Sequence, residues 1–346
     1  MTKRTEVAKL AGVSEATVSR VLSGTGPIKE ATRLKVLEAA DALGYVPSDI
    51  ARQFAKKRSG NLGVVLPFMP NVPLFSTFYF SQLLGGIGLA AGERGLNLLL
   101  IFRQPGDASP YAGLFRSRKA DACIVLGSSE VPGEREALLE LESAGYPYAV
   151  AGQRFEGLEH RTADGDHAAG SRQTVAHLHG LGCRSIAFVG GPAQYSNSGD
   201  RYAGYVEGLA QADLPLRQEI VLEGKYSRKS GLALASQVEE LLRSGQADSV
   251  YAGNDRMAIG IMQGLLEKGI QAGKDYALAG YDGSDGASMT SPQLTSVAVP
   301  FDEVGRQAAL RAIGEAEGGI VPPKELMLAT RLAARDSTLL YRPGRP

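Results

Sequence analysis

The 346-residue chain has little of what marks secreted, zinc-binding or membrane proteins. It contains only two cysteines, Cys123 and Cys183, which lie in apolar surroundings without a CxxC partner, so we expect neither a disulfide scaffold nor a zinc site. His177 and His179 are two residues apart and would point to different sides of a helix, which argues against a metal pair. We therefore expect no metal and no cofactor.

Long apolar runs are also missing. No stretch approaches the roughly 20 apolar residues of a membrane span, and Lys3 and Arg4 lead into a helical pattern rather than into a signal sequence. We expect a cytoplasmic protein that does not enter a membrane.

Net charge is zero, with 37 basic and 37 acidic side chains, but the charge is unevenly distributed. Up to Gly60 the chain carries eleven Lys and Arg against six Asp and Glu, so this part is +5 and the remainder is −5. A small basic head on a mildly acidic body fits DNA binding by the head alone.

Residues 5–23 predict two short helices joined by a tight turn. Gly12 stands where crossing helices need a residue without a Cβ, and Ser14 is placed to cap the second helix. Apolar residues at helical spacing predict the buried faces: Val7, Ala8 and Leu10, then Val18, Val21 and Leu22. A small, mostly polar face remains for the DNA major groove, made of Glu15, Ala16, Thr17, Ser19 and Arg20. An ordinary helical hairpin is the alternative.

A third helix is expected over 30–43, ended by Gly44. Its predicted core stripe is Ala31, Leu34, Leu37, Ala40 and Leu43. After it, Ser48 can cap a helix of barely two turns, which is marginal alone because isolated helices need about 12–15 residues. We expect this segment to order only with DNA and a second copy; a plain charged linker is the alternative.

From Asn61 short apolar strands alternate with helical stretches, which predicts parallel sheets covered on both faces. About ten such units indicate two doubly wound lobes rather than one sheet. Residues 86–91 match a loose GxGxxA pattern, but they lie inside a helical pattern, so we expect close helix-to-sheet packing there rather than a dinucleotide site.

Polar side chains follow four of the predicted strands, where ligands bind in open α/β sheets. They are Arg154, Arg201, Asn254, Asp255 and Asp282. Arginine forks donate and carboxylates accept, which together suit a ligand with many hydroxyls. Asp255 alone could simply cap the next helix. No nucleophile elbow, HExxH, Walker A or EF-hand motif is present, so an enzyme has little support.

The stretches EVAKLAGVSEATVSRVLSG (6–24) and IKEATRLKVLEAADALGYVPSDIARQFA (28–55) resemble the lactose-repressor (LacI/GalR) family of bacterial transcription regulators, and the similarity continues nearly to the C-terminus. The resemblance implies an all-α helix-turn-helix head and a periplasmic-binding-protein-like body of two lobes joined by three crossover strands. We expect the crossovers near 161–164, 291–295 and 323–328. The expected domains are 1–46, a hinge at 47–60, a first lobe of 61–162 with 294–325, and a second lobe of 163–293 with 326–346.

The resemblance also implies roles for residues. Family members often carry Ser at the position of Lys29, so the third helix is expected to lack that cap, and Lys29 could reach a phosphate instead. In the hinge, Phe54 matches the family's minor-groove wedge, usually Leu, and phenylalanine can part base steps. The full set expected at DNA is Thr5, Ser14, Glu15, Ala16, Thr17, Ser19, Arg20, Lys29, Arg52, Phe54 and Lys56.

For the small-molecule site, the resemblance supports Arg201, Asn254 and Asp282 and leaves Asp255 doubtful. The loop 67–80 matches the family's lining of the other side, where Phe75 and Tyr79 could stack on a sugar. Many relatives have Asp-Arg where this chain has Gln153 and Arg154, which makes Arg154 more prominent. The expected effector residues are Phe75, Tyr79, Arg154, Arg201, Asn254 and Asp282.

These observations predict a homodimeric, allosteric repressor of transcription, not an enzyme. It would bind a pseudo-palindromic operator in double-stranded DNA and respond to a small molecule, a sugar or glycoside, held between its lobes. An acidic or phosphorylated sugar is left open by the two arginines. The alternatives are a sugar-binding protein or a sugar-converting enzyme without a DNA role.

Overall fold

The computed structural model describes residues 2–24, 26–45, 58–69, 73–104, 107, 110–131, 133–321 and 323–342. The chain divides into two compact units, Met1–Gly60 and Asn61–Pro346. We call them the head and the body, and each is described by itself.

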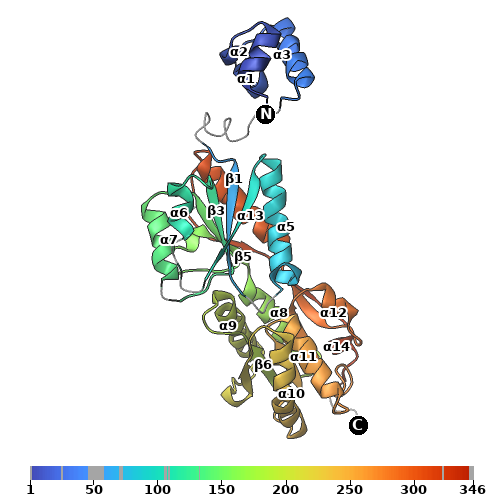
Figure 1. Cartoon of the computed structure of the whole chain (residues 1–346). Coiled ribbons are helices and arrows are strands. Elements are labelled where there is room, and N and C mark those ends of the chain that lie inside the picture. Colours follow the sequence, from blue (N-terminus) through green and yellow to red (C-terminus); the bar gives the residue numbers. More distant parts are fainter. Residues whose placement is uncertain are drawn as a thin grey trace. The chain divides into compact units, whose positions relative to one another are not determined.

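The head is a bundle of three helices (Figure 1), α1 (Arg4–Ala11), α2 (Glu15–Ser23) and α3 (Glu30–Ala42). Its small core consists of Val7, Ala8, Val18, Val21, Val36, Ala39 and Ala40. The predicted faces of the first two helices are confirmed, except that Leu10 is exposed.

The core stripe predicted for α3 was wrong in part. Leu34 and Leu37 are 51% and 42% exposed and Ala31 is exposed too, whereas Val36 and Ala39 are buried together with Ala40. Val36, Ala39 and Ala40 stand at i, i+3 and i+4, so they form one face of α3, and this second apolar face is the one that packs in the core of the head. Lys29 makes no side-chain cap, as expected.

The body has two lobes, each built on a six-stranded sheet. The first-lobe sheet has the order β11-β5-β4-β3-β1-β2 and the second-lobe sheet the order β12-β10-β9-β8-β6-β7. All neighbours pair in parallel except β10 and β12. Strands such as Ala122–Leu126 are buried along their whole length, as expected for a sheet covered on both faces. The predicted fold class is confirmed.

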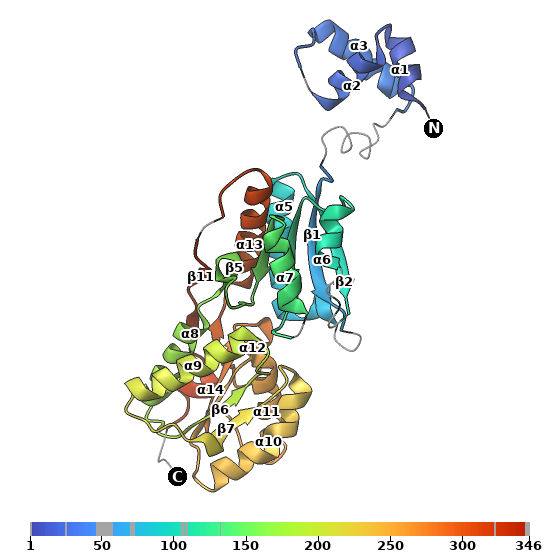
Figure 2. The ribbon, with the colours of Figure 1, turned by 90° about the vertical axis from the view of Figure 1, so that its left-hand side faces the viewer.

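In the first lobe, α5 and α13 cover one face of the sheet and α6 and α7 the other (Figure 2). Its elements are β1 (Asn61–Pro67), α5 (Phe78–Glu93), β2 (Asn97–Arg103), α6 (Pro110–Arg116), β3 (Ala122–Leu126), α7 (Glu134–Ser143), β4 (Tyr148–Ala151), β5 (Thr162–Gly165), α13 (Phe301–Ala316) and β11 (Leu326–Leu328).

In the second lobe, α8 packs against α9, and α10 packs against α11. Its elements are α8 (His167–Gly180), β6 (Ile186–Gly190), α9 (Ser196–Gln211), β7 (Val221–Glu223), α10 (Arg228–Arg243), β8 (Ser249–Ala252), α11 (Asp255–Leu266), β9 (Ala277–Asp282), α12 (Asp285–Met289), β10 (Thr295–Ala298), β12 (Arg331–Ala333) and α14 (Asp336–Leu339).

The chain changes lobes three times, directly after β5, β10 and β11. The expected boundaries differ from this by a few residues, because β10 belongs to the second sheet and β5 and β11 belong to the first. In particular the second crossing lies at 299–300 rather than at 291–295. Such short strands carry no periodicity that assigns them to one sheet or the other.

The glycines of the GxGxxA pattern lie inside α5, so they do not form a nucleotide loop. A Cβ on Gly86 would stand 1.7 Å from the Asp302 carbonyl oxygen of α13. The close packing is therefore between two helices, rather than between helix and sheet as expected.

Candidate functional site

The turn between α1 and α2 has the geometry that the sequence predicts. Gly12 has a φ of 65°, a left-handed conformation that favours glycine. The Ser14 hydroxyl accepts from the Thr17 backbone N–H at 3.1 Å and caps α2. Arg4 pairs with Glu15 at 3.2 Å, which ties the start of α1 to the first turn of α2.

The residues predicted to meet DNA form an accessible surface on the head. Thr5, Ser14, Ala16, Arg20 and Lys29 are exposed. Glu15, Thr17 and Ser19 are partly buried. The hinge residues Arg52, Phe54 and Lys56 lie outside the described residues.

In the body, the predicted arginine after β6 lies at the centre of a buried cluster. The Arg201 side chain is 4% exposed, and its Nη1 donates to the Gly253 carbonyl oxygen at 2.6 Å. Its Nη2 lies 3.5 Å from Oδ1 of Asp282 at the end of β9. The guanidinium carbon lies 4.2 Å from the ring centroid of Tyr281 and 5.6 Å from that of Tyr226.

These contacts hold a guanidinium in a buried site by hydrogen bonds and by two aromatic faces. We call Tyr79, Arg201, Tyr226, Tyr281 and Asp282 the interlobe cluster. Within the part of the chain that the structure describes, Nε of Arg201 has no hydrogen-bond partner. A buried donor without a partner is costly, and a ligand oxygen would relieve that cost.

Burial raises the pKa of Asp282 to about 8. The positive charge of Arg201 lowers this pKa, but by less than burial raises it, and the nearby Asp255 raises it further. At neutral pH this carboxyl therefore holds a proton in a substantial fraction of molecules. The group can then donate as well as accept a hydrogen bond.

Asp255 does not cap α11; that position belongs to Asn254, whose side chain accepts from the Met257 N–H at 2.9 Å. The Asp255 carboxylate instead accepts from the Ser296 hydroxyl and from both the backbone and the hydroxyl of Ser284. Burial raises its pKa to about 6 despite these bonds. The amide nitrogen of Asn254 donates to the Tyr226 carbonyl oxygen, so both ends of this amide already have protein partners.

The two aromatic residues predicted in the first lobe are not brought together. The Tyr79 hydroxyl donates to the Gly152 carbonyl oxygen at 3.4 Å. Burial raises the pKa of this hydroxyl. The same Gly152 carbonyl oxygen accepts from Nδ2 of Asn197 of α9 at 3.3 Å, so Tyr79 lies where the two lobes meet. Phe75, in contrast, is 55% exposed and packs edge-on against Phe102 at the end of β2.

The segment after β4 contacts the second lobe. The backbone N–H of Arg154 donates to the Ser196 hydroxyl at 2.8 Å, and Gln153 Oε1 accepts from the Ser196 N–H. The Arg154 guanidinium pairs with Asp200 of α9 at 2.6 Å, so this predicted effector residue joins the lobes in the structure. Gly152 has a φ of 73° and a Cβ there would lie 2.1 Å from the Tyr79 oxygen, which explains why this chain has glycine.

Sequence reasoning missed two members of the interlobe cluster, Tyr226 and Tyr281, and also Phe301, which packs against Tyr79. Tyr281 directly precedes Asp282 at a strand end and could have been included on that ground. Tyr226 lies in a loop after β7, and Phe301, which packs 5.1 Å from Tyr79, follows the second crossing. Neither carries a local pattern that would mark it.

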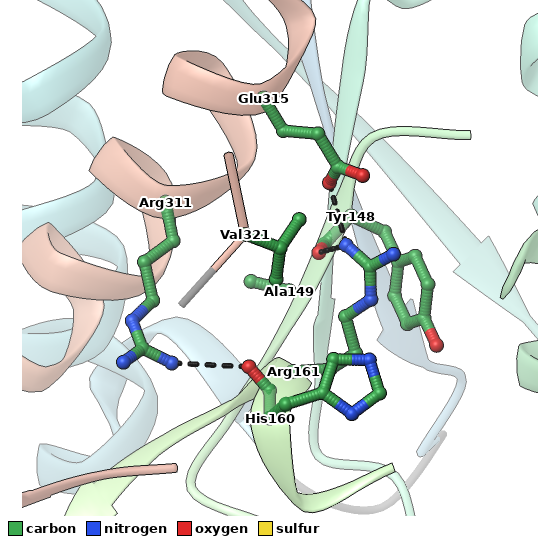
Figure 3. Close-up of a pocket in the computed structure, with 7 residues that line it drawn as sticks. All are labelled: Tyr148, Ala149, His160, Arg161, Arg311, Glu315 and Val321. Atoms are coloured by element: carbon green, nitrogen blue, oxygen red, sulfur yellow. Dashed lines mark hydrogen bonds and ion pairs between the residues drawn. The ribbon is translucent and has the colours of Figure 1, made fainter. Parts of the chain in front are cut away.

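Two cavities in the body lie elsewhere. Figure 3 shows one of about 10 Å³ at the amino edge of the first-lobe sheet, room for about one water. It is lined by Tyr148, Ala149, His160, Arg161, Arg311, Glu315 and Val321. The other, about 380 Å³, lies beside the loop 271–275 that precedes β9, at the sheet edge opposite Asp282.

The small cavity marks a structural joint. Arg161 bonds to Glu142 and Glu315, both at 2.6 Å (Figure 3 draws the bond to Glu315). Arg311 of α13 donates to the carbonyl oxygens of His160, Thr162 and Lys324, each at 3.1 Å. The three segments that lead to and from the second lobe are thereby fixed to one another.

Among the described residues, no group of three or more His, Cys, Asp or Glu is arranged to hold a metal ion. No helix in the described ranges combines the length and apolar character that crossing a membrane requires.

Comparison with known families gives two matches. The model of bacterial regulatory proteins of the lacI family matches residues 5–48, and that of the periplasmic binding protein-like domain matches residues 175–338.

Curated relatives match almost the whole chain. The HTH-type transcriptional regulator AscG of Escherichia coli (strain K12) is 33% identical over 98% of this chain and 99% of its own length. The HTH-type transcriptional regulator CelR of Thermobifida fusca is 32% identical over 96% of each.

Solved structures agree. The transcriptional regulator CelR–cellobiose complex aligns with a TM-score of 0.73 at 29% identity, over 97% of this chain and 100% of that chain. The lac repressor dimer bound to operator and the anti-inducer ONPF aligns with a TM-score of 0.82 at 25% identity, over 98% of this chain and 99% of that one.

Proposed function

The chain belongs to the LacI family of bacterial DNA-binding transcription regulators, and on that premise we propose that it is a cytoplasmic homodimeric repressor controlled by a sugar or glycoside. The sugar would bind between the lobes and change the affinity of the head for a pseudo-palindromic operator. Relatives matched over their full length are transcription regulators, and nothing in the chain favours a transport protein or an enzyme instead.

One observation carries the effector site. Arg201 is buried at the ends of the second-lobe strands, held by Gly253 and Tyr281, with its Nε lacking a partner in the described chain. Asp282 beside it can donate or accept. Tyr79 of the first lobe lies at the contact between the lobes, where it shares the Gly152 carbonyl oxygen with Asn197. Donors, an acceptor and aromatic faces on both sides suit a polyhydroxylated ring. The cellobiose in the CelR structure supports a carbohydrate here too.

For DNA recognition, we propose that α2 enters the major groove with Thr17, Ser19 and Arg20 toward the base edges. The two charge-bearing flanks, Lys29 and the hinge residues Arg52 and Lys56, would meet phosphates, and Phe54 would insert in the minor groove. A two-fold dimer would place two such helices on two half-sites.

For the dimer, we propose an apolar surface on the first lobe. Leu98, Leu100 and Phe102 are exposed on one side of β2, which is the edge strand of its sheet, and exposed Leu89 lies on neighbouring α5. Large apolar side chains exposed together on an edge strand mark a site of protein–protein contact, and a second copy of the chain would bury them. The lac repressor dimer is consistent with such an assembly.

The experiment is a thermal-shift screen of the full-length protein against cellobiose, other β-glucosides, free sugars, uronates and sugar phosphates. A ligand at 100 times its Kd adds about 2.7 kcal/mol of stability. A sugar that raises Tm in the wild type and not in Arg201→Lys would support the proposed site; if every sugar that binds stabilises both equally, the site lies elsewhere.

A further inference from the structure

A buried histidine stands at the point where the chain leaves the first lobe. Asp164 lies in β5 of the first-lobe sheet, and His167 is the first residue of α8 in the second lobe. Asp166 between them caps α8 through the Ala169 N–H. The chain therefore passes from one lobe to the other within three residues, and any relative rotation of the lobes must be accommodated close to His167.

The imidazole of His167 joins the two sheets. Its Nε2 lies 3.1 Å from Oδ1 of Asp164 and its Nδ1 lies 3.2 Å from the Tyr281 hydroxyl of β9. The hydroxyl also donates to the backbone carbonyl oxygen of His167, at 3.2 Å. The His167 side chain is fully buried and that of Asp164 is 2% exposed, so water does not compete for these bonds.

The third crossover packs close to the same hydroxyl, and the second packs against the first. A Cβ on Gly170 of α8 would lie 2.4 Å from the Tyr281 oxygen and 2.8 Å from the hydroxyl oxygen of Thr330, which stands in the third crossover. One on Gly165 would lie 2.7 Å from Val299 in the second crossover. The first crossover is therefore closely packed against the other two, and a rotation of the lobes that separates β5 from β9 would change the contacts of the Tyr281 hydroxyl.

The ring of Tyr281 is also the surface on which the Arg201 guanidinium lies, at 4.2 Å. His167 thus fixes one end of a tyrosine whose face supports the proposed effector-binding arginine. We propose that His167 is a positioning residue that couples the interlobe cluster to the crossover segments, through the Tyr281 hydroxyl. This proposal rests on the proposed function for its biological meaning, but the coupling itself can be measured without effector or DNA.

The test is hydrogen–deuterium exchange of the full-length, ligand-free protein. Three backbone N–H groups donate hydrogen bonds from one lobe to the other. That of Glu130 donates to the Gln194 carbonyl oxygen. That of Arg154 donates to the Ser196 hydroxyl, and that of Ser196 donates to Oε1 of Gln153. Tyr281→Phe keeps the ring under Arg201 and removes only the hydroxyl. His167→Gln is a second variant: its amide nitrogen can take the place of Nε2 beside Asp164, but it has no polar atom where Nδ1 meets the Tyr281 hydroxyl.

A matched control exists on the neighbouring strand. The Tyr251 hydroxyl bonds to Ser171 of the same helix α8 at 2.6 Å, equally buried but within the second lobe. Tyr251→Phe therefore removes a comparable hydrogen bond without touching a crossover. If His167 only stabilised α8, all three variants would speed amide exchange within α8 and leave exchange of the interlobe amides unchanged.

We expect Tyr281→Phe and His167→Gln to speed exchange of the interlobe amides by about fivefold or more, since one hydrogen bond is worth about 1 kcal/mol. Tyr251→Phe should leave them unchanged. Equal exchange at these amides in Tyr281→Phe and Tyr251→Phe would overturn the coupling. Failure of the protein to bind any operator would refute the proposed function but not this result.

Discussion

The guanidinium carbon of Arg201 lies 4.2 Å from the ring centroid of Tyr281, and the residue that follows the tyrosine, Asp282, is within ion-pair distance of the same guanidinium. A strand end of the second lobe thus provides both an aromatic support and a titratable partner for one buried cation. The effector site, its pH dependence and its communication with the crossovers all follow from this arrangement.

Arg201→Lys should abolish the stabilisation of the protein by its sugar while leaving operator binding in the absence of sugar close to wild type. A lysine cannot bond to Gly253, lie flat on Tyr281 and offer Nε at the same time. The measurement is the sugar-dependent Tm shift beside fluorescence anisotropy with operator DNA. Arg217→Lys, at a partly exposed arginine of the same lobe that pairs with Glu219, serves as the control and should keep the shift. Loss of the shift in both variants would argue against a specific role of Arg201.

Stability of the ligand-free protein should fall as pH rises from about 5 to 8. The folded protein holds a proton on Asp282 up to a pKa of about 8, whereas the unfolded chain releases it near 3.8, so rising pH favours unfolding over this interval. Asp255, with a pKa of about 6, acts in the same direction up to that pH. Each group contributes a slope of up to about 1.4 kcal/mol per pH unit.

The check is the free energy of unfolding by urea at several pH values for wild type and Asp282→Asn. The asparagine variant should show a distinctly flatter decline between pH 7 and 8, where Asp255 is almost fully ionised and Asp282 dominates the slope. Parallel curves for the two proteins would contradict the protonated state of Asp282.

Much of the fold could be predicted from the sequence, because its local patterns agree with the tertiary structure. Gly12 and Ser14 mark the turn and the cap of α2, and apolar runs such as Ala122–Leu126 mark buried parallel strands. The boundaries of the lobes could not be predicted as well, since short crossover strands such as Thr295–Ala298 contain nothing that says which sheet they join.

For the site, strand ends pointed to Arg201 and Asp282, which the structure brings together. Arg154 follows a strand just as clearly, yet its guanidinium pairs with Asp200, since only the tertiary arrangement decides which charge faces which. The Arg201–Tyr226 contact joins residues from separate loops, so no sequence pattern could reveal it.

Arg20→Ala should weaken operator binding by about 1–3 kcal/mol and relax specificity at one base position, because the exposed arginine on α2 is proposed to read a base edge. Lys35→Ala removes the same charge from exposed α3 and serves as the control. Competition binding with single-base operator variants separates the two. If Arg20→Ala and Lys35→Ala lost the same operator affinity and neither changed base preference, Arg20 would contribute only general electrostatic attraction to DNA.

Phe54→Gly should abolish tight operator binding and leave the sugar-dependent Tm shift near wild type, because the proposed wedge acts only on DNA. Phe54→Leu, the residue usual in the family, should restore most of the affinity. Unchanged operator affinity in the glycine variant would exclude the wedge.

Leu100→Asp should convert the dimer to monomers, because it places a charge in the centre of the apolar surface on β2. Sedimentation velocity measures the change, and Leu216→Asp, at an exposed leucine of the second lobe, is the control. A Leu100→Asp protein that still sediments as the wild-type dimer would show that the copies meet through another surface.

The most direct measurement of the central claim is salt-dependent anisotropy of the full-length protein with a duplex selected from a random library, with and without a sugar found in the thermal screen. We predict that affinity falls steeply with salt concentration and changes at least about tenfold when the sugar is bound, a coupling of about 1.4 kcal/mol. A protein with no salt-sensitive affinity for any selected duplex, in either condition, would contradict the account.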